Sequence, residues 1–140
     1  MSDGFFTFDG STEWASTSDT AALDLTGDIE IRVDVAADDW SPGATKAMTG
    51  KYGGSSGSGG WRFGVSASGV LLVTIDDGTT ATNIFSSTNP SFTDGERYQI
   101  RVTVDISGYS VFFYYRTDGD LTATTGWTQV GTEQTGTAIS

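Results

Sequence analysis

Hydrophobic and polar residues alternate along two segments of the chain, residues 28–35 and 98–105. The alternate positions carry β-branched or aromatic side chains, which are Ile29, Ile31, Val33 and Val35 in the first segment and Tyr98, Ile100, Val102 and Val104 in the second. A period of two is typical of an antiparallel strand with one buried and one solvated face. We therefore predict two strands that lie side by side, with these residues pointing inward and with Arg32 and Arg101 each facing an opposite charge.

Short segments bounded by turn residues predict further strands. They are residues 5–8, 13–16, 45–52, 61–66, 70–76, 80–85, 109–117 and 127–131. Glycines stand where tight turns require a positive φ, in Asp9-Gly10, Asp77-Gly78, Asp94-Gly95, Ser107-Gly108 and Asp118-Gly119. Residues 66–69 are predicted to close a hairpin. Because the chain carries no apolar stripe of helical period, we expect an all-β fold, a sandwich or a barrel with little or no helix.

The length of the chain predicts a single domain over residues 1–140, because chains of about 100–150 residues usually close around one core. Residues 53–60 have the Gly/Ser composition of a flexible linker, which makes a domain boundary one interpretation. We favour an internal loop, because each strand before it has an apolar face that only later strands would cover.

Charge and composition exclude several classes of function. Seven Lys and Arg against 18 Asp and Glu give a net charge of −11, which repels nucleic acid and anionic membrane surfaces. The chain has no Cys and no His, so disulfides, thiolate nucleophiles and Ser-His-Asp catalysis are excluded. No apolar run is long enough to cross a bilayer, and residues 1–4 do not begin a secretory signal.

Paired carboxylates are the only catalytic groups that this composition leaves open. Asp28, Glu30 and Asp34 share the outer face of one predicted strand, where alternate residues lie about 6.5–7 Å apart. That spacing would suit a glycosidase pair. Arg32, however, lies between Glu30 and Asp34 and would keep both ionised. We therefore expect a solvated charged face and no enzymatic activity.

Calcium is the one cofactor that we leave open, because hard cations accept carboxylate and carbonyl oxygens. The main candidate ligands are Asp118 and Asp120. Further candidates are Asp76, Asp77, Asp9 and Asp19. None fits the twelve-residue calcium loop, which needs a Glu at a fixed offset. Since Asp is also a common turn residue, we predict no resident cofactor.

Aromatic residues near loops are candidates for a platform that stacks on sugar rings. The candidates are Trp40, Tyr52, Trp127 and either Tyr114 or Tyr115. Packing at loop edges is the competing role, and the one that we favour for each of them. Trp14 and Trp61 are predicted to point into the core. In residues 109–116 apolar groups occupy both faces, so we expect one of these faces to be a binding surface or a subunit contact.

Several stretches together resemble laminin-G-like, concanavalin A-like jelly-roll domains. They are residues 6–11, Trp14, residues 23–33, Lys51 before the Gly-rich segment, and residues 61–64, 94–103 and 127–131. The resemblance covers nearly the whole chain and implies a β-sandwich of two antiparallel sheets, one of them curved, that binds glycan or protein. Some relatives are glycoside hydrolases with a Glu-x-Asp-x-Glu-type strand. Because Arg32 interrupts that series here, the hydrolase role is not carried over.

The C-terminal end departs from this family. Its members usually end with a strand that returns beside the first one, whereas this chain stops at residues 138–140, soon after 127–131. We therefore expect an assembly-dependent unit, or one that lacks its last strand, since bare sheet edges recruit other strands. A Thr-, Ser- and Gly-rich, acidic chain with no export signal fits a protein of a tailed-phage virion, where modules of this family are frequent.

The resulting expectation is a non-catalytic module of a bacteriophage virion protein, such as a minor tail or host-contact component. It would bind cell-surface glycan through Trp40, Tyr52, Tyr114 and Trp127, and its other partners would be virion proteins. One alternative is a capsid-decoration or oligomerisation domain that uses the face of Phe112 and Tyr114. Another is a carbohydrate-binding module of a secreted bacterial glycosidase. We expect an oligomer or a larger assembly, with no nucleic acid and no membrane insertion.

Overall fold

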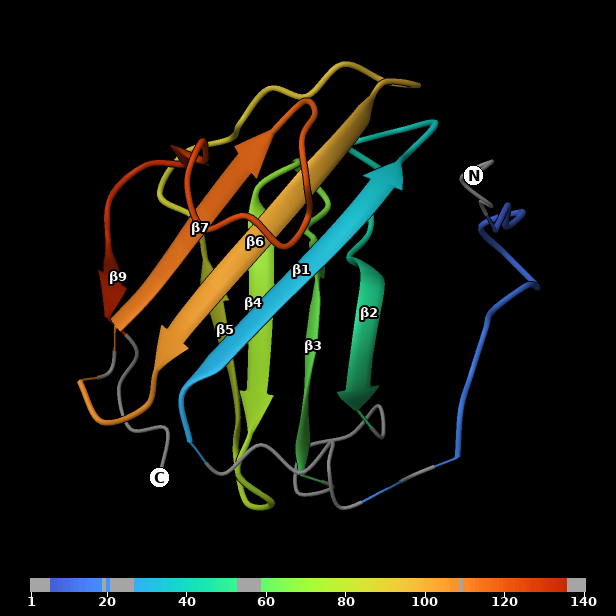
Figure 1. Cartoon of the computed structure of the whole chain (residues 1–140). Helices are drawn as coiled ribbons and strands as arrows, with labels where there is room; N and C mark the ends of the chain where they lie inside the picture. Colours follow the sequence, from blue (N-terminus) through green and yellow to red (C-terminus); the bar gives the residue numbers. More distant parts are fainter. Residues whose placement is uncertain (1–5, 19, 21–26, 53–58, 109, 136–140) are drawn as a thin grey trace.

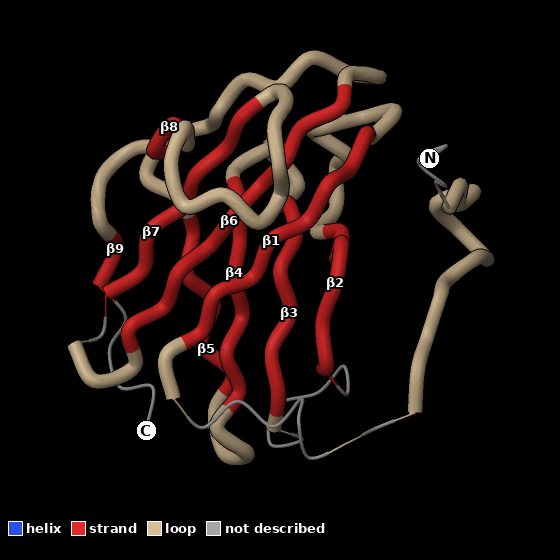
Figure 2. The backbone as a smooth tube through the Cα atoms, in the orientation of Figure 1, coloured by secondary structure: helices blue, strands red, loops and turns tan. Residues whose placement is uncertain are grey.

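In the part of the chain that the structure describes, nine strands form two antiparallel sheets that pack face to face (Figures 1 and 2). The computed structural model describes residues 6–18, 20, 27–52, 59–108 and 110–135. The strands are β1 (Ile29–Ala36), β2 (Lys46–Tyr52), β3 (Gly60–Val65), β4 (Leu71–Asp76), β5 (Ala81–Phe85), β6 (Arg97–Asp105), β7 (Ser110–Arg116), β8 (Thr128–Gln129) and β9 (Gln134–Thr135). The predicted all-β sandwich is confirmed. The described part of the chain contains no helix long and apolar enough to span a membrane.

The five-stranded sheet has the order β1-β6-β7-β8, and β9 also pairs with β7. The predicted pairing of the two alternating segments is confirmed, because β1 runs antiparallel to β6 with Ile31 opposite Val102. The same register sets Arg32 directly opposite Arg101. The opposite charge expected for each arginine comes from Glu30, which forms a salt bridge with both. Strand β9 was not predicted, and the predicted strand 127–131 is reduced to β8.

The four-stranded sheet is a meander in the order β2-β3-β4-β5. The predicted hairpin between β3 and β4 is confirmed, because the Ser66 N–H donates to the Val70 carbonyl at 2.9 Å and the Gly69 N–H to the Ser66 carbonyl at 3.1 Å. The predicted loop 53–60 lies outside the described residues except for Gly59 and Gly60, and Gly60 already begins β3. Residues 109 and 136–140 also lie outside them.

The hydrophobic core fills the space between the two sheets. Phe63 and Val73 point into it from the four-stranded sheet, and Val102 and Phe113 from the other, all fully buried. The rings of Phe63 and Phe113 meet across the interface, with centroids 6.4 Å apart. Trp61, predicted to be a core residue, is partly buried and packs against this cluster.

Residues 6–18, the N-terminal arm, do not join either sheet and stand apart from the sandwich (Figure 1). The predicted strands 5–8 and 13–16 are therefore wrong for all their described residues, and residue 5 lies outside them. Trp14, predicted to be buried, is 79 % exposed. The physical reason is that a strand needs a pairing partner, and turn residues at the ends of a short segment supply none.

Candidate functional site

The outer face of the five-stranded sheet gathers the charged and aromatic side chains of three strands. Since Ile31, Val102 and Phe113 are buried in the core, the residues alternating with them point away from it. These outward residues are Glu30, Arg32 and Asp34 of β1, Gln99, Arg101 and Thr103 of β6, and Phe112, Tyr114 and Arg116 of β7. The strict alternation in the sequence already assigns most of them to one face.

Glu30 joins the two arginines that the register sets opposite each other. Its Oε2 accepts a hydrogen bond from Arg101 Nη2 at 2.7 Å, and its Oε1 accepts one from Arg32. Partial desolvation would raise the pKa of the Glu30 carboxyl, but the hydrogen bonds from Arg101 and Arg32, together with their charges, bring it below its ordinary value. The glutamate is therefore ionised at neutral pH, as predicted for a carboxylate beside Arg32.

Asp34 is held by a different arginine from the one that the sequence suggested. The guanidinium of Arg97 donates two hydrogen bonds of 2.6 Å to its two carboxylate oxygens, and Gln99 Nε2 donates a third at 3.1 Å. The hydrogen bond from Arg97 is the main cause that lowers the pKa of Asp34. Arg32 donates instead to Glu30 and to backbone carbonyls.

Residues 117–127, the crossing loop, return across this face after β7 (Figure 1). Arg32 Nη1 donates to the carbonyls of Leu121 at 2.7 Å and Ala123 at 3.2 Å. Gln99 Nε2 donates to the Gly119 carbonyl at 2.9 Å, and Arg116 donates to carbonyls of the same loop. Arg32, Gln99 and Arg116 therefore fix the loop on the sheet through hydrogen bonds to its backbone carbonyls.

Tyr114 and Trp127, two of the predicted platform residues, lie together around Arg101. The Arg101 guanidinium carbon is 5.0 Å from the Tyr114 ring centre and 5.8 Å from that of Trp127. Arg116 is closer to Trp127, at 4.3 Å. The indole N–H of Trp127 donates to the Ala123 carbonyl at 2.9 Å. Cation–π contacts and one hydrogen bond thus lock this tryptophan at the end of the crossing loop.

A groove of about 270 Å³ opens on the same face, at the end of the sheet where β1 begins. Its lining is Asp28, Ile29, Glu30, Thr103, Val104, Asp105, Ser110 and Phe112. The Phe112 ring stacks on that of Tyr114, with centroids 6.4 Å apart, so an aromatic ridge continues from the groove toward Trp127. Sequence reasoning named Phe112 only as a subunit contact, although the alternation in 109–116 places it beside Tyr114.

The other two predicted platform residues lie elsewhere. Trp40 is 2 % exposed and belongs to the core, where its ring packs against Phe92 at 4.8 Å and Tyr98 at 5.7 Å. Trp40 therefore takes the packing role that we had also considered for it, and its burial excludes it from a surface platform. Tyr52 lies on the four-stranded sheet, 4.9 Å from the Arg62 guanidinium. The four residues do not form one platform.

Four of the candidate calcium ligands, Asp9, Asp76, Asp77 and Asp120, cap turns. Asp120 Oδ1 accepts hydrogen bonds from the hydroxyl of Thr122 at 2.7 Å and from its N–H at 2.9 Å, and these bonds lower the pKa of Asp120. Asp76, Asp77 and Asp9 accept backbone N–H groups in the same manner, whereas Asp19 lies outside the described residues. Within the described ranges no group of three or more carboxylates is placed to hold a metal ion, so Asp118 and Asp120 have no further acidic partners there.

The protein is thus an all-β sandwich of two antiparallel sheets. The outer face of its five-stranded sheet carries a groove lined by aromatic and charged side chains. Compared with protein-family models, with curated proteins and with solved structures, the chain has no match.

Proposed function

We propose that the chain is a non-catalytic module that binds glycan on the outer face of its five-stranded sheet. The observation that carries this proposal is the groove between Glu30, Thr103 and Phe112, continued by the Tyr114 ring. A sugar presents an apolar C–H face and a rim of hydroxyls. An aromatic ridge beside carboxylates and hydroxyls offers a partner for each of these surfaces.

The lowered pKa of the Glu30 carboxyl favours glycan binding over glycan hydrolysis. A glycosidase needs one carboxyl with a raised pKa to protonate the leaving group. Here Arg101 and Arg32 lower the pKa of Glu30, so this carboxylate accepts hydrogen bonds from sugar hydroxyls and does not donate a proton.

The resemblance to concanavalin A-like jelly rolls supports the same proposal, and it carries the biological setting. On that resemblance we place the module in a tailed-phage virion protein that contacts cell-surface glycan. A carbohydrate-binding module of a secreted glycosidase is the alternative setting, and it would use the same face.

A glycan array with the purified chain tests the proposal, followed by titration calorimetry with any glycan that binds. We expect Phe112→Ala and Tyr114→Ala to weaken binding by about tenfold or more, since a central aromatic contact is worth over about 1.4 kcal/mol. The matched control is Phe85→Ala, which removes a ring that is 43 % exposed on the other sheet. Absence of binding to any glycan, or equal losses in all three variants, would overturn the proposal.

A further inference from the structure

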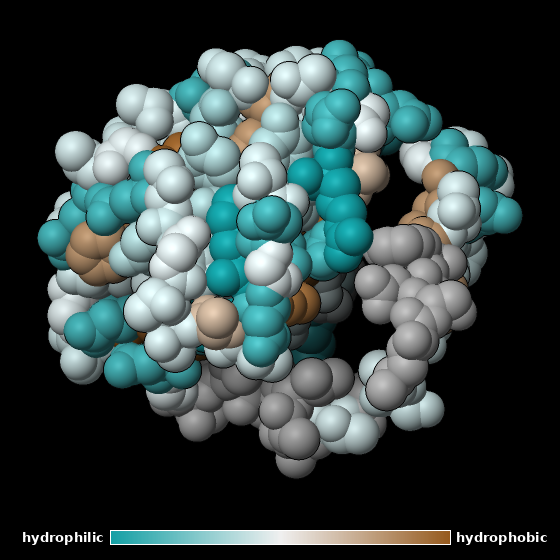
Figure 3. Space-filling model, turned by 45° about the horizontal axis from the view of Figure 1, so that its top comes forward, coloured by the Kyte–Doolittle hydropathy of each residue, from teal (hydrophilic) through white to brown (hydrophobic). Residues whose placement is uncertain are grey.

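The N-terminal arm carries three large aromatic side chains that the sandwich leaves uncovered. Phe6 is 84 % exposed, Phe8 48 % and Trp14 79 %. Figure 3 shows the arm set apart from the rest of the molecule, with hydrophobic side chains on its surface. Exposed aromatic patches of this kind mark protein interaction sites.

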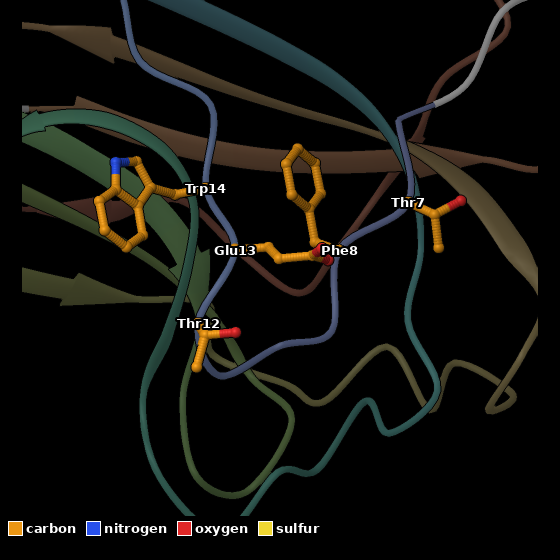
Figure 4. A pocket seen from close by; sticks show the side chains of 5 residues that line it. All are labelled: Thr7, Phe8, Thr12, Glu13 and Trp14. Carbon is orange, nitrogen blue, oxygen red and sulfur yellow. The ribbon is translucent and has the colours of Figure 1, made fainter.

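The tip of the arm has a defined shape of its own. Asp9 Oδ1 accepts hydrogen bonds from the N–H groups of Ser11, Thr12 and Glu13 at 2.7 to 3.0 Å, and the Asp9 N–H donates to Glu13 Oε2 at 2.9 Å. This reciprocal capping holds the turn without help from the sandwich. A hollow of about 340 Å³ lies within the turn, and Phe8 and Trp14 flank Glu13 there (Figure 4). The rings are therefore presented by an ordered turn.

The sandwich has a complementary surface on the side nearest the arm. Strands β1 and β2 are the edge strands of their sheets and contact each other, and among the described residues each pairs with one strand only. The inward side chains of Val33, Val35 and Met48 pack against the core there but remain only partly buried. We call this surface the β1–β2 flank. An edge strand beside uncovered apolar side chains accepts an added strand.

Charge assigns the arm to this flank. Residues 6–18 contain Asp9 and Glu13 and no basic residue, whereas β2 carries both lysines of the chain, Lys46 and Lys51. Lys46 is exposed at the start of the strand. In a chain with a net charge of −11, the exposed Lys46 on an edge strand is a natural contact for an acidic segment.

We propose that the arm of one copy docks on the β1–β2 flank of a second copy, so that two chains exchange their arms. In such a reciprocal dimer the flank of each copy covers the arm of the other, so the two contacts are identical, as twofold symmetry requires. Three rings from each arm, at about 150–250 Å² each and already partly covered, bury with the flank surface that they contact on the order of 1,000–2,000 Å². That area reaches the roughly 1,000 Å² typical of a specific interface.

Analytical ultracentrifugation of the full chain tests this exchange. At micromolar concentration the wild-type chain should have a molecular mass twice the 14.7 kDa of a single chain. Trp14→Ala, in the arm, and Lys46→Glu, on the flank, should each weaken the dimer by about tenfold or more. Phe85→Ala, an exposed ring at the far edge of the same sheet as β2, is the matched control and should leave the dimer unchanged.

Mixing the two defective variants gives the decisive result. The Lys46→Glu chain has an intact arm and the Trp14→Ala chain has an intact flank, so a mixed dimer keeps one wild-type contact beside one doubly altered contact. The mixture should therefore form more dimer than either variant alone at the same chain concentration. A wild-type monomer would overturn the exchange and would indicate docking of the arm within one chain. A mixture that stays monomeric, or a Trp14→Ala chain that dimerises like wild type, would also overturn it.

Discussion

Glu30 resolves a local conflict that the sheet register creates. Arg32 and Arg101 lie directly opposite each other on β1 and β6, and like charges at paired positions destabilise a sheet. The Glu30 carboxylate accepts hydrogen bonds from both guanidinium groups and compensates for their repulsion. This arrangement follows from the two-residue period of β1, which sets Glu30 and Arg32 on the same face.

The stability of the sandwich should depend on this carboxylate in acid. The folded-state pKa values of Glu30 and Asp34 lie below their ordinary values, so their stabilisation is present above about pH 4 and is lost as the pH falls through the folded values. Glu30→Gln should lower the free energy of unfolding at pH 6 by roughly 0.5–1 kcal/mol and should flatten its decline between about pH 4 and pH 2. Urea denaturation at a series of pH values measures both effects.

The control for this prediction is Glu96→Gln, which removes an exposed carboxylate in the turn before β6. We expect the acid-induced decline of the control to follow that of the wild type. A Glu30→Gln chain with the same decline as wild type would contradict the assigned role of Glu30.

Individual strands could be predicted wherever the sequence alone determines their two faces. The alternation in 28–35 and 98–105 identified β1, β6 and their inward residues, because burial of one face imposes a period of two. Segments 5–8 and 13–16, predicted only from their flanking turn residues, are not strands in the described part of the chain, since pairing depends on a partner that local sequence does not specify. Trp40 was misplaced for a related reason, because its contact with Phe92 joins residues far apart in the sequence.

The pairing of β2 with β3 should depend on a glycine that sequence reasoning did not single out. A Cβ at Gly64 would lie 2.0 Å from the carbonyl oxygen of Lys46 on β2, a backbone atom that cannot move without separating the strands. Gly64→Ala should therefore lower the free energy of unfolding by about 3 kcal/mol or more. Gly27→Ala, where a Cβ would meet nothing within 4 Å, should change it by less than about 0.5 kcal/mol. Thermal and urea unfolding compare the two variants, and equal stabilities would contradict this account.

Across the whole molecule, the sandwich separates residues that composition alone would group together. Tyr52 and Tyr114 both suggested a sugar platform, but they lie on different sheets, and only Tyr114 adjoins the groove. Aromatic residue type and position near a loop therefore predicted the kind of side chain in the candidate site, but not the sheet on which the site lies. The face itself could have been predicted from the alternation in 98–105 and 109–116, whereas the groove depends on how three strands and a loop meet.

The two sheets should unfold as one unit, because Phe63 of one and Phe113 of the other meet at the centre of the core. Phe63→Ala and Phe113→Ala should each lower the free energy of unfolding by about 3–5 kcal/mol. Since the two rings contact each other, the double variant should lose less than the sum of the single losses. Phe112→Ala provides the neighbouring control, because this ring points away from the core, and it should cost less than about 1.5 kcal/mol. Urea denaturation monitored by tryptophan fluorescence and circular dichroism measures all four variants. Strictly additive losses, or a Phe112→Ala loss equal to that of Phe113→Ala, would show that the sheets are not joined through this contact.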